Sequence, residues 1–387
     1  MKLNSHDEWG HLREVILGTV ENFAPGLELE AGDEGKLQEA SRLCARAYPP
    51  WYLDEVAEDL EGLARILREW GARVHRPAWT GKRADFRTPN WSASGFDIYN
   101  VRDLHAVFGD LLVSSASASR FRLFEHYAIQ PLVYQHYLAQ GMRWAHAPPP
   151  RLTGTYRIER QRDRSPLEKD EDQRHARLSS GLAQTFHQLV EDEILFDAAN
   201  VIRLGEDVLY LVSSTGNRLG AAWLQATLGD RYRVHVTNAY RSSHLDSTIL
   251  PLRPGFVLLN AARVDEASCP AIFARWTKLY FQDVAPLPDE EIAFHRDVRL
   301  PVHAELKALG VESTLEHMSS PWAGLNVLSL DARTVLVHDR QVELTRRLEA
   351  SGFEVIPVRM RHCYSMLGGL HCSTLDTVRD GEAADHR

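Results

Sequence analysis

Apolar residues along the chain are grouped into short runs that come in pairs. Each pair consists of two strand-length runs rich in β-branched residues, separated by a tight turn that contains Gly or Asp. Such pairs predict β-hairpins. They occupy the segments 104–115, 201–213, 248–260 and 325–338.

Further strands are predicted near both ends of the chain, in the segments 11–20, 354–360 and 372–378. If the first of these strands pairs with the last, the chain forms a fifth unit and closes on itself.

Between the hairpins, apolar residues recur at the spacing of an α-helix. The segment 53–70 has this pattern and ends at Gly71, a residue typical of helix C-termini. The same pattern predicts helices at 121–140, 182–193, 221–228, 301–309 and 341–351. The segment 156–177 is instead dense in charge and poor in apolar residues, which predicts a solvated loop or insertion, with a partner-binding role as the alternative.

Units of helix and hairpin that repeat about five times favour a closed ring over an open sheet. Repeats of this kind bury a continuous core only by packing on their neighbours. The 387 residues could form two or three ordinary domains or one large domain built from repeats. The recurring units favour a single α/β domain over residues 1–387.

Composition and charge narrow the class of protein. Hydrophobic residues make up 44% and charged residues 25%, the balance of a soluble globular protein. The net charge of −9 favours neither nucleic acid nor an anionic membrane as a partner, and it is compatible with a cationic substrate. The first residues contain no apolar signal core, and the four cysteines are too few for a disulfide scaffold. We therefore expect a cytoplasmic protein with reduced thiols.

Reactive and ionisable residues fall at the same place in successive units. They are Asp103 before the first hairpin, Asp197 before the second, His244 and Asp246 before the third, Ser319 and Ser320 before the fourth, and Cys372 at the start of the closing strand. In a ring, side chains at equivalent places point to the same end of the axis, as active-site loops do on other closed scaffolds. We therefore expect one active site at that end.

These residue types support covalent catalysis. A cysteine is a good nucleophile as the thiolate, which a neighbouring histidine can provide, and a buried aspartate fixes the tautomer of that histidine. Cys372, His244 and Asp197 supply these three groups. The carboxylates of Asp103 and Asp246 suit a guanidinium, whose planar fork matches carboxylates.

Each of these residues also has an ordinary structural interpretation. A lone cysteine beside a strand is usually part of the core, although Gly368 and Gly369 before Cys372 permit close backbone approach. His244 could be a surface or satisfied core histidine, and Asp197 could cap a turn.

Two adjacent pairs, His362–Cys363 and His371–Cys372, could suggest zinc. They lack the Cys-x-x-Cys spacing of zinc ribbons, so we expect neither a metal nor another cofactor.

Longer motifs give these residues a family context. The segments SHDEWGHLREVILGTVEN, RTPNWSASGFDIYNVRD, FDAAN, SHLDST, MSSPWAGLNVLSLD and GGLHCSTLDTVRD follow one another over nearly the whole chain. In them the sequence resembles the glycine amidinotransferase family, which includes arginine:glycine and inosamine-phosphate amidinotransferases. The resemblance implies the five-bladed α/β propeller of the pentein superfamily. It also implies transfer of an amidino group from L-arginine to an amine.

The resemblance also implies a role for each site residue. Cys372 corresponds to the nucleophile, His244 to the catalytic histidine, Asp197 to the triad aspartate, Asp103 and Asp246 to the guanidinium ligands, and Arg263, with Ser319 and Ser320, to the donor-carboxylate site. The chain departs from the vertebrate glycine-using enzyme at Arg241 and Ser243, where that enzyme has Asn and Met. The smaller Ser243 leaves room for an acceptor larger than glycine, and Arg241 could pair with its phosphate or carboxylate.

The expected reaction releases ornithine and leaves an amidino group on Cys372 for an amine acceptor, with an aminocyclitol among the candidates. A homodimer is compatible with the resemblance. Two other functions remain open: a guanidine hydrolase of the same superfamily, such as an arginine deiminase, and a non-catalytic arginine-binding protein. Incubation with arginine alone separates them, because a hydrolase turns over continuously whereas a transferase stops after one release of ornithine.

Overall fold

Five three-stranded sheets form the body of the protein. The structure is a computed structural model, and it describes residues 2–30, 32–77, 85–159, 186–240, 242–316 and 321–386. In each sheet two strands pair antiparallel, and a third strand lies parallel to the middle one. In order of pairing the sheets are β20 (Thr374–Arg379), β1 (Leu12–Leu17) and β3 (Arg73–His75); β6 (His105–Phe108), β7 (Leu111–Ser114) and β8 (Arg143–His146); β11 (Val201–Leu204), β12 (Asp207–Leu211) and β13 (Arg233–Thr237); β14 (Ile249–Arg253), β15 (Phe256–Asn260) and β16 (Thr277–Phe281); and β17 (Leu328–Ser329), β18 (Thr334–His338) and β19 (Glu354–Val358).

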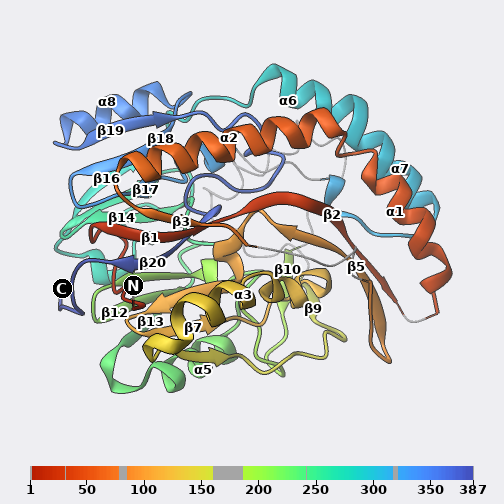
Figure 1. Ribbon diagram of the computed structural model, residues 1–387, viewed down its shortest axis with the longest axis horizontal. Helices are drawn as coiled ribbons and strands as arrows, with labels where there is room; N and C mark the ends of the chain where they lie inside the picture. The colour runs from red at the N-terminus through yellow and green to blue at the C-terminus, as the bar shows by residue number, and fades with distance from the viewer. Residues whose placement is uncertain are drawn as a thin grey trace.

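The predicted hairpins and the closure of the chain are confirmed. The four hairpins are β6–β7, β11–β12, β14–β15 and β17–β18. β1 pairs antiparallel with β20 in a register that sets Leu17 opposite Thr374. Figure 1 shows these two strands side by side, with both chain ends on the same side of the molecule. The fold is therefore the pseudo-symmetric α/β propeller that the sequence predicts.

Helical connections lead from the middle strand of a sheet to its parallel third strand, as parallel pairing requires. α2 (Pro50–Glu69), α5 (Arg218–Leu228) and α8 (Val342–Ala350) have this place and confirm three predicted helices. The predicted helix at 301–309 is α7 (Leu300–Ala308), which follows α6 (Asp289–Phe294) between the fourth and fifth sheets. In the described residues no helix combines the length and the apolar character that crossing a bilayer needs.

Two helix predictions differ from the structure. The segment 121–140 is helical but irregular, because Pro131 interrupts the α-helical hydrogen bonding. It divides into a 3-10 helix (Arg120–Ala128), α3 (Gln130–Leu132), a π-helical turn (Val133–Tyr137) and a second 3-10 turn (Leu138–Gln140).

The predicted helix at 182–193 is wrong where the structure describes it. Phe186–Leu189 is strand β10, which pairs antiparallel with β9 (Tyr156–Glu159). Cross-strand pairing outweighs local helix propensity here. β9 is also the described beginning of the segment predicted to be a solvated loop, and the rest of that prediction, 160–177, lies outside the described residues.

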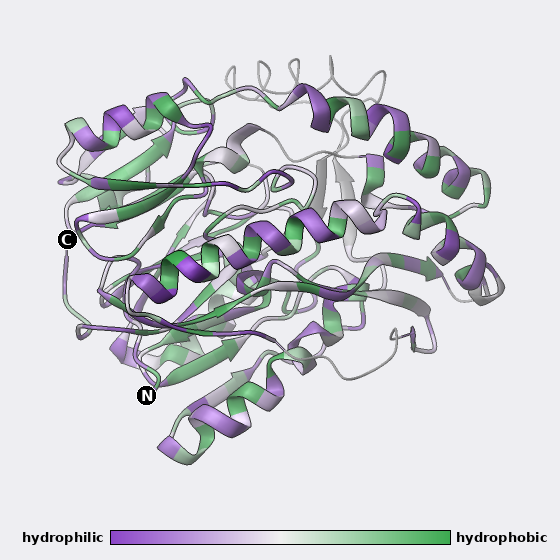
Figure 2. Ribbon diagram, turned by 45° about the horizontal axis from the view of Figure 1, so that its top comes forward, coloured by the Kyte–Doolittle hydropathy of each residue, from purple (hydrophilic) through white to green (hydrophobic). Residues whose placement is uncertain are grey.

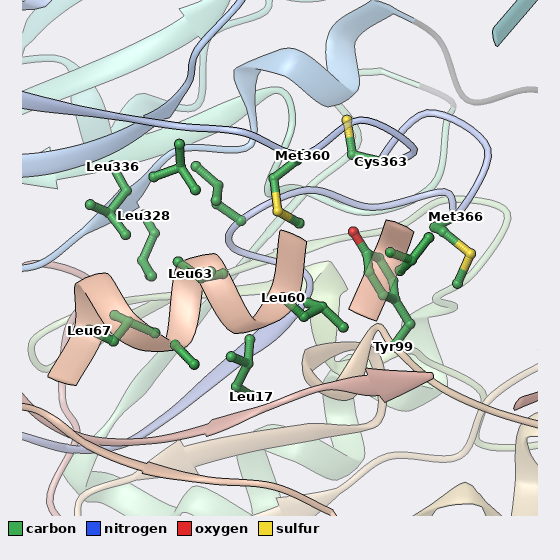
Figure 3. Packing of buried hydrophobic residues seen from close by; sticks show 14 of the residues in the cluster. Leu17, Leu60, Leu63, Leu67, Tyr99, Leu328, Leu336, Met360, Cys363 and Met366 are labelled. Atoms are coloured by element: carbon green, nitrogen blue, oxygen red, sulfur yellow. The ribbon is translucent and has the colours of Figure 1, made fainter. Parts of the chain in front are cut away.

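The apolar face of α2 joins the first and fifth sheets. Leu60, Leu63 and Leu67 lie on this face at helical spacing and are at most 1% exposed. They belong to one buried cluster with Leu17 of β1 and Leu336 of β18 (Figure 3). Figure 2 shows the amphipathic pattern of the helix, with apolar and polar residues on different faces. This packing covers the junction between the first and fifth sheets.

A further sheet extends from the first unit. β2 (Thr19–Glu30) pairs antiparallel with β5 (Trp91–Ile98), which also pairs with β4 (Asp85–Arg87). α1 (Leu37–Ala45) packs between β2 and α7, on the right of Figure 1. β2 follows β1 directly, and only Gly18 separates them. A Cβ on that residue would lie 1.9 Å from the carbonyl oxygen of Tyr99, so the two backbones approach at a distance that only glycine allows.

We expect Gly18→Ala to lower the free energy of unfolding by about 2 kcal/mol or more, because the added methyl group meets backbone rather than a movable side chain. The matched control is Gly62→Ala in the interior of α2, where a Cβ meets nothing within 4 Å. That change should stabilise the protein by about 0.5–1 kcal/mol, since glycine weakens a helix interior. Urea unfolding measures both, and equal effects at the two glycines would contradict the close approach.

Candidate active site

The loops before successive strands bring the predicted site residues together. Asp103 lies in the 3-10 turn that precedes β6, and Asp197 directly precedes the turn that leads into β11. The backbone N–H of Leu245 donates to Ala199 at 2.9 Å, which ties the loop of His244 and Asp246 to the Asp197 turn. The N–H of Arg102 donates to the carbonyl of Cys372 at 3.3 Å. Segments far apart in sequence thus meet at one end of the ring.

His244 lies between two carboxylates. Its Nε2 is 3.0 Å from Asp197 Oδ2, and its Nδ1 is 3.8 Å from Asp103 Oδ1. Its backbone has a left-handed φ of 35°, and the hydroxyl of Tyr240 donates to its carbonyl. Burial disfavours the charged ring, but the Asp103 charge and the Asp197 hydrogen bond outweigh it and raise the pKa of His244 to about 9. At neutral pH His244 is therefore an imidazolium and a potential acid.

Cys372 is held by Asp246 and Asn326. Its thiol donates to Asp246 Oδ2 at 3.0 Å, and Asn326 Nδ2 donates to its sulfur at 3.2 Å. The other amide atom, Asn326 Oδ1, accepts the backbone N–H of Cys372 at 2.9 Å. Burial, together with the charges of Asp246 and Asp103, raises the pKa of the Cys372 thiol well above its usual value. In the free protein the thiol is protonated.

The two glycines before Cys372 have the structural role that the sequence predicts. A Cβ on Gly368 would lie 2.0 Å from Asn100 Oδ1 and 2.8 Å from the Cβ of Cys372. A Cβ on Gly369 would lie 2.8 Å from that of Asn326. Any larger residue would push the loop away from the side chains that hold the thiol.

Two carboxylates of the site have an oxygen without a hydrogen-bond donor among the described residues. Asp103 Oδ2 is paired with Arg122, whereas its Oδ1 is buried and accepts no hydrogen bond, with His244 Nδ1 at 3.8 Å as its ion-pair neighbour. Asp197 Oδ2 faces His244, and its Oδ1 is likewise buried and unpartnered. Burial raises the pKa of Asp103, although the charges of His244 and Arg122 act against this. Because buried acceptors almost always have a donor, this arrangement suits a ligand rich in N–H groups.

The residues predicted around the outer part of the site are only partly described. Arg263 donates to Thr248 Oγ1 at 2.9 Å, and its guanidinium lies 5.6 Å from the centre of the Tyr240 ring. Tyr240 also contacts His244, so Arg263 is one residue removed from the candidate acid. Ser243, which directly precedes His244 in the sequence, is exposed. Arg241, Ser319 and Ser320 lie outside the described residues.

The sequence did not identify several residues that the structure places in the site. Asn326 donates to the sulfur of Cys372, and Arg122 pairs with Asp103. His371 contacts Asp246 at 3.0 Å and Glu8 at 3.2 Å. Asn326 and His371 stand inside motifs that were noted, but nothing local indicates their contacts. In the described ranges no group of three or more His, Cys, Asp or Glu residues is arranged to hold a metal ion.

Comparison with known proteins gives long and consistent similarities, although the chain matches no family model. Inosamine-phosphate amidinotransferase 1 of Streptomyces griseus is 35% identical over 97% of this chain and 96% of its own length. The L-arginine:L-lysine amidinotransferase of Pseudomonas savastanoi pv. phaseolicola is 29% identical over 98% of this chain and 94% of its own.

Solved structures agree with these relatives. The inosamine-phosphate amidinotransferase of Streptomyces griseus superposes with a TM-score of 0.76 at 32% identity and covers 99% of both chains. An amidinotransferase of the saxitoxin pathway from Microseira wollei gives a TM-score of 0.77 at 30% identity, covering 100% of this chain and 99% of its own. A dimethylarginine dimethylaminohydrolase adduct, at 13% identity and a TM-score of 0.53 over 94% of this chain and 99% of its own, shares the fold.

The raised pKa of His244 predicts how stability depends on pH. The contacts of the imidazolium stabilise the fold fully below the ordinary pKa of 6.5, and this contribution is lost as the pH rises through about 9. We expect Asp197→Asn to lower the free energy of unfolding at pH 6 by on the order of 1–2 kcal/mol, with the difference from wild type shrinking above pH 9. Urea unfolding between pH 6 and 10 measures it. The exposed Asp283→Asn is the control, and a difference that is the same at every pH would contradict the assignment.

Proposed function

Because the chain belongs to the amidinotransferase family, we propose that it transfers the amidino group of L-arginine to an amine acceptor through a covalent intermediate on Cys372. The observation that carries this proposal is the arrangement of one thiol, one imidazolium and three buried carboxylates around a single site. Asp246 contacts Cys372, and His244 lies between Asp103 and Asp197.

The donor fits the acceptors of the site. A guanidinium has five N–H donors in a plane, and the oxygens of Asp103 and Asp197 that accept no hydrogen bond are acceptors for them. Asp246 provides a third carboxylate beside the thiol. We assign Arg263 to the α-carboxylate of arginine, together with Ser319 and Ser320.

Binding of the donor would also activate the nucleophile. The charges of Asp246 and Asp103 contribute to the raised pKa of Cys372, so a guanidinium cation placed against them lowers that pKa and favours the thiolate. The same cation offsets the charge that Asp103 exerts on His244 and makes the imidazolium a stronger acid. Both changes occur only when a cationic donor is present.

In the first half-reaction the sulfur of Cys372 forms a bond to the central guanidinium carbon, and the bond from that carbon to the side-chain nitrogen of arginine breaks. The thiol proton is released to solvent when the cationic donor binds. His244 then donates its proton to the departing amine, ornithine leaves, and His244 is left neutral. In the second half-reaction the acceptor amine loses a proton to the neutral His244 and bonds to the same carbon while the C–S bond breaks, and the released thiolate regains a proton from solvent when the product leaves. Proton transfer of this kind contributes roughly 10²–10⁴-fold to the rate.

We propose that the acceptor is larger than glycine and of the aminocyclitol type. Relatives that are named for inosamine phosphate are 35% identical to this chain, whereas the glycine amidinotransferase of Danio rerio is 28% identical. Ser243 is a small, exposed residue next to His244, which leaves space on the side where the acceptor amine would meet its base. Arg241 is assigned to an anionic group of the acceptor.

Cys372→Ser should abolish ornithine release and amidino transfer together. With arginine alone, the wild-type protein should release one equivalent of ornithine and stop, because water does not complete the cycle. Rapid-quench product analysis and intact mass spectrometry measure the burst and the adduct. Cys269→Ser is the matched control, since this half-buried cysteine lies outside the site.

Either of two results would overturn the proposed transfer. Continuous formation of citrulline or ammonia would show a hydrolase, and stoichiometric arginine binding without an adduct would show a binding protein. A Cys372→Ser protein that still releases ornithine would refute the assignment of the nucleophile.

Filling the space at Ser243 should weaken binding of the acceptor without affecting the reaction with arginine. We expect Ser243→Met to raise the KM for an aminocyclitol phosphate about tenfold, while the rate of the ornithine burst changes less than about twofold. Ser243→Ala removes the hydroxyl without filling the space and should leave this KM near the wild-type value. Steady-state kinetics with isotopically labelled arginine measures the KM, and an unchanged value in Ser243→Met would place the acceptor elsewhere.

A further inference from the structure

A second histidine stands behind the nucleophile and is not part of the proposed triad. His371 Nδ1 lies 3.0 Å from Asp246 Oδ2, and its Nε2 lies 3.2 Å from Glu8 Oε2. The thiol of Cys372 donates to the same oxygen, Asp246 Oδ2, at 3.0 Å. The four side chains form a continuous row from Glu8 to Cys372, and each of these residues is at most 5% exposed.

A carboxylate faces each ring nitrogen of His371. An ionised carboxylate can only accept hydrogen bonds, so the ring makes both contacts as a donor only when each of its nitrogens carries a proton. The hydrogen bond and the charge of His371 help to lower the pKa of Asp246 well below its usual value, although burial acts against the carboxylate charge.

The far end of the row is fixed in place. Glu8 accepts two hydrogen bonds of 2.9 Å from the guanidinium of Arg203, which also donates to Asp376 at 2.8 Å. Arg102 donates to the backbone carbonyl of His371 at 2.9 Å. The imidazolium is thus clamped between its two carboxylates and cannot turn away from Asp246 without breaking buried ion pairs.

The shared oxygen couples the two neighbours of Asp246. Asp246 Oδ2 accepts from the His371 imidazolium and from the Cys372 thiol at the same distance. An acceptor that is already engaged by a cation attracts a second proton less strongly. We propose that His371 is a positioning residue that acts through Asp246. Its contact weakens the attraction of the Asp246 carboxylate for the Cys372 proton, and it keeps that carboxylate pointed at the sulfur.

The other charges around the thiol act in a known direction. Asp103 and Asp246 both favour the protonated thiol. The charge of His244 also acts on Asp246 and lowers its pKa. Behind the row, Glu8 is paired with Arg203 and, at 3.6 Å, with Arg102, whereas His371 is the basic side chain in direct contact with the Asp246 carboxylate.

The experiment compares two amides that each keep one of the two donors of the ring. In His371→Asn the amide nitrogen can replace Nδ1 toward Asp246, and in His371→Gln it can replace Nε2 toward Glu8. Both variants lose the positive charge. In the absence of arginine, the curve of iodoacetamide alkylation rate against pH, measured from pH 7 to 10, should move upward by about one pH unit in both.

The two variants should differ in the donor half-reaction. This part of the inference rests on the proposed function, whereas alkylation of the free thiol does not. We expect the single-turnover ornithine burst to be about tenfold slower in His371→Gln than in His371→Asn, because only asparagine still holds Asp246 in position. The KM for arginine should change less than the burst rate.

His362→Gln is the matched control. His362 also lies between two carboxylates, Glu55 and Glu291, in the loop that leads to Cys372, but it does not contact the thiol. Its alkylation curve should coincide with that of the wild type, and thermal unfolding checks the folding of all variants. If the curves of both His371 variants coincide with the wild type while only their thermal stability falls, His371 is merely structural and the proposal is overturned.

Discussion

The buried ion pairs of Arg203 are the interaction on which the rest of the structure depends. Arg203 extends from β11 to Glu8 near the N-terminus and to Asp376 in β20, and it also donates to the carbonyl of Val107 in β6. It therefore links the first, second and third units at the place where the chain closes. Removing one partner of such a group leaves an uncompensated charge in the interior, which typically costs about 3–5 kcal/mol. Hydrophobic packing by α2 covers the junction of the first and fifth sheets. The charges around Arg203 instead specify which segments of the first three units lie together.

The candidate active site is connected to these buried charges, because Glu8 contacts both Arg203 and His371. Burial, together with the charges of Asp246 and Asp103, raises the pKa of the Cys372 thiol well above its usual value, so the site holds this proton tightly. In the proposed reaction this protects the nucleophile until a cation arrives. The carboxylates that favour the protonated form of the free thiol are also the groups that a guanidinium would bind, so in the proposed reaction recognition of the donor and activation of the sulfur are one event.

The sequence predicted what local pattern encodes and missed what distant contacts decide. Hairpins and the closing strand follow from runs of apolar residues and turns, and the recurring place of Asp103, Asp197 and Cys372 follows from the repetition of units. β10 was predicted as helix, because its partner strand lies on the other side of a long charged segment. Asn326 stands in a recognised motif, yet its role depends on contacts with a residue 46 positions away. No periodicity contains that information.

In the proposed reaction ornithine leaves before the acceptor amine enters. This order would let the acceptor vary while the residues that bind the amidino group stay the same. In the proposed reaction, the amidino group that remains on Cys372 after ornithine departs would still be a cation and would still face Asp103 and Asp246. The charge balance of the inner site is therefore the same before and after the exchange. What changes is the outer half, where the amine of the donor leaves and another amine enters beside His244. The small, exposed Ser243 borders this half. On this proposal, a change of acceptor would require changes in the loop before β14 and would leave the buried charges as they are.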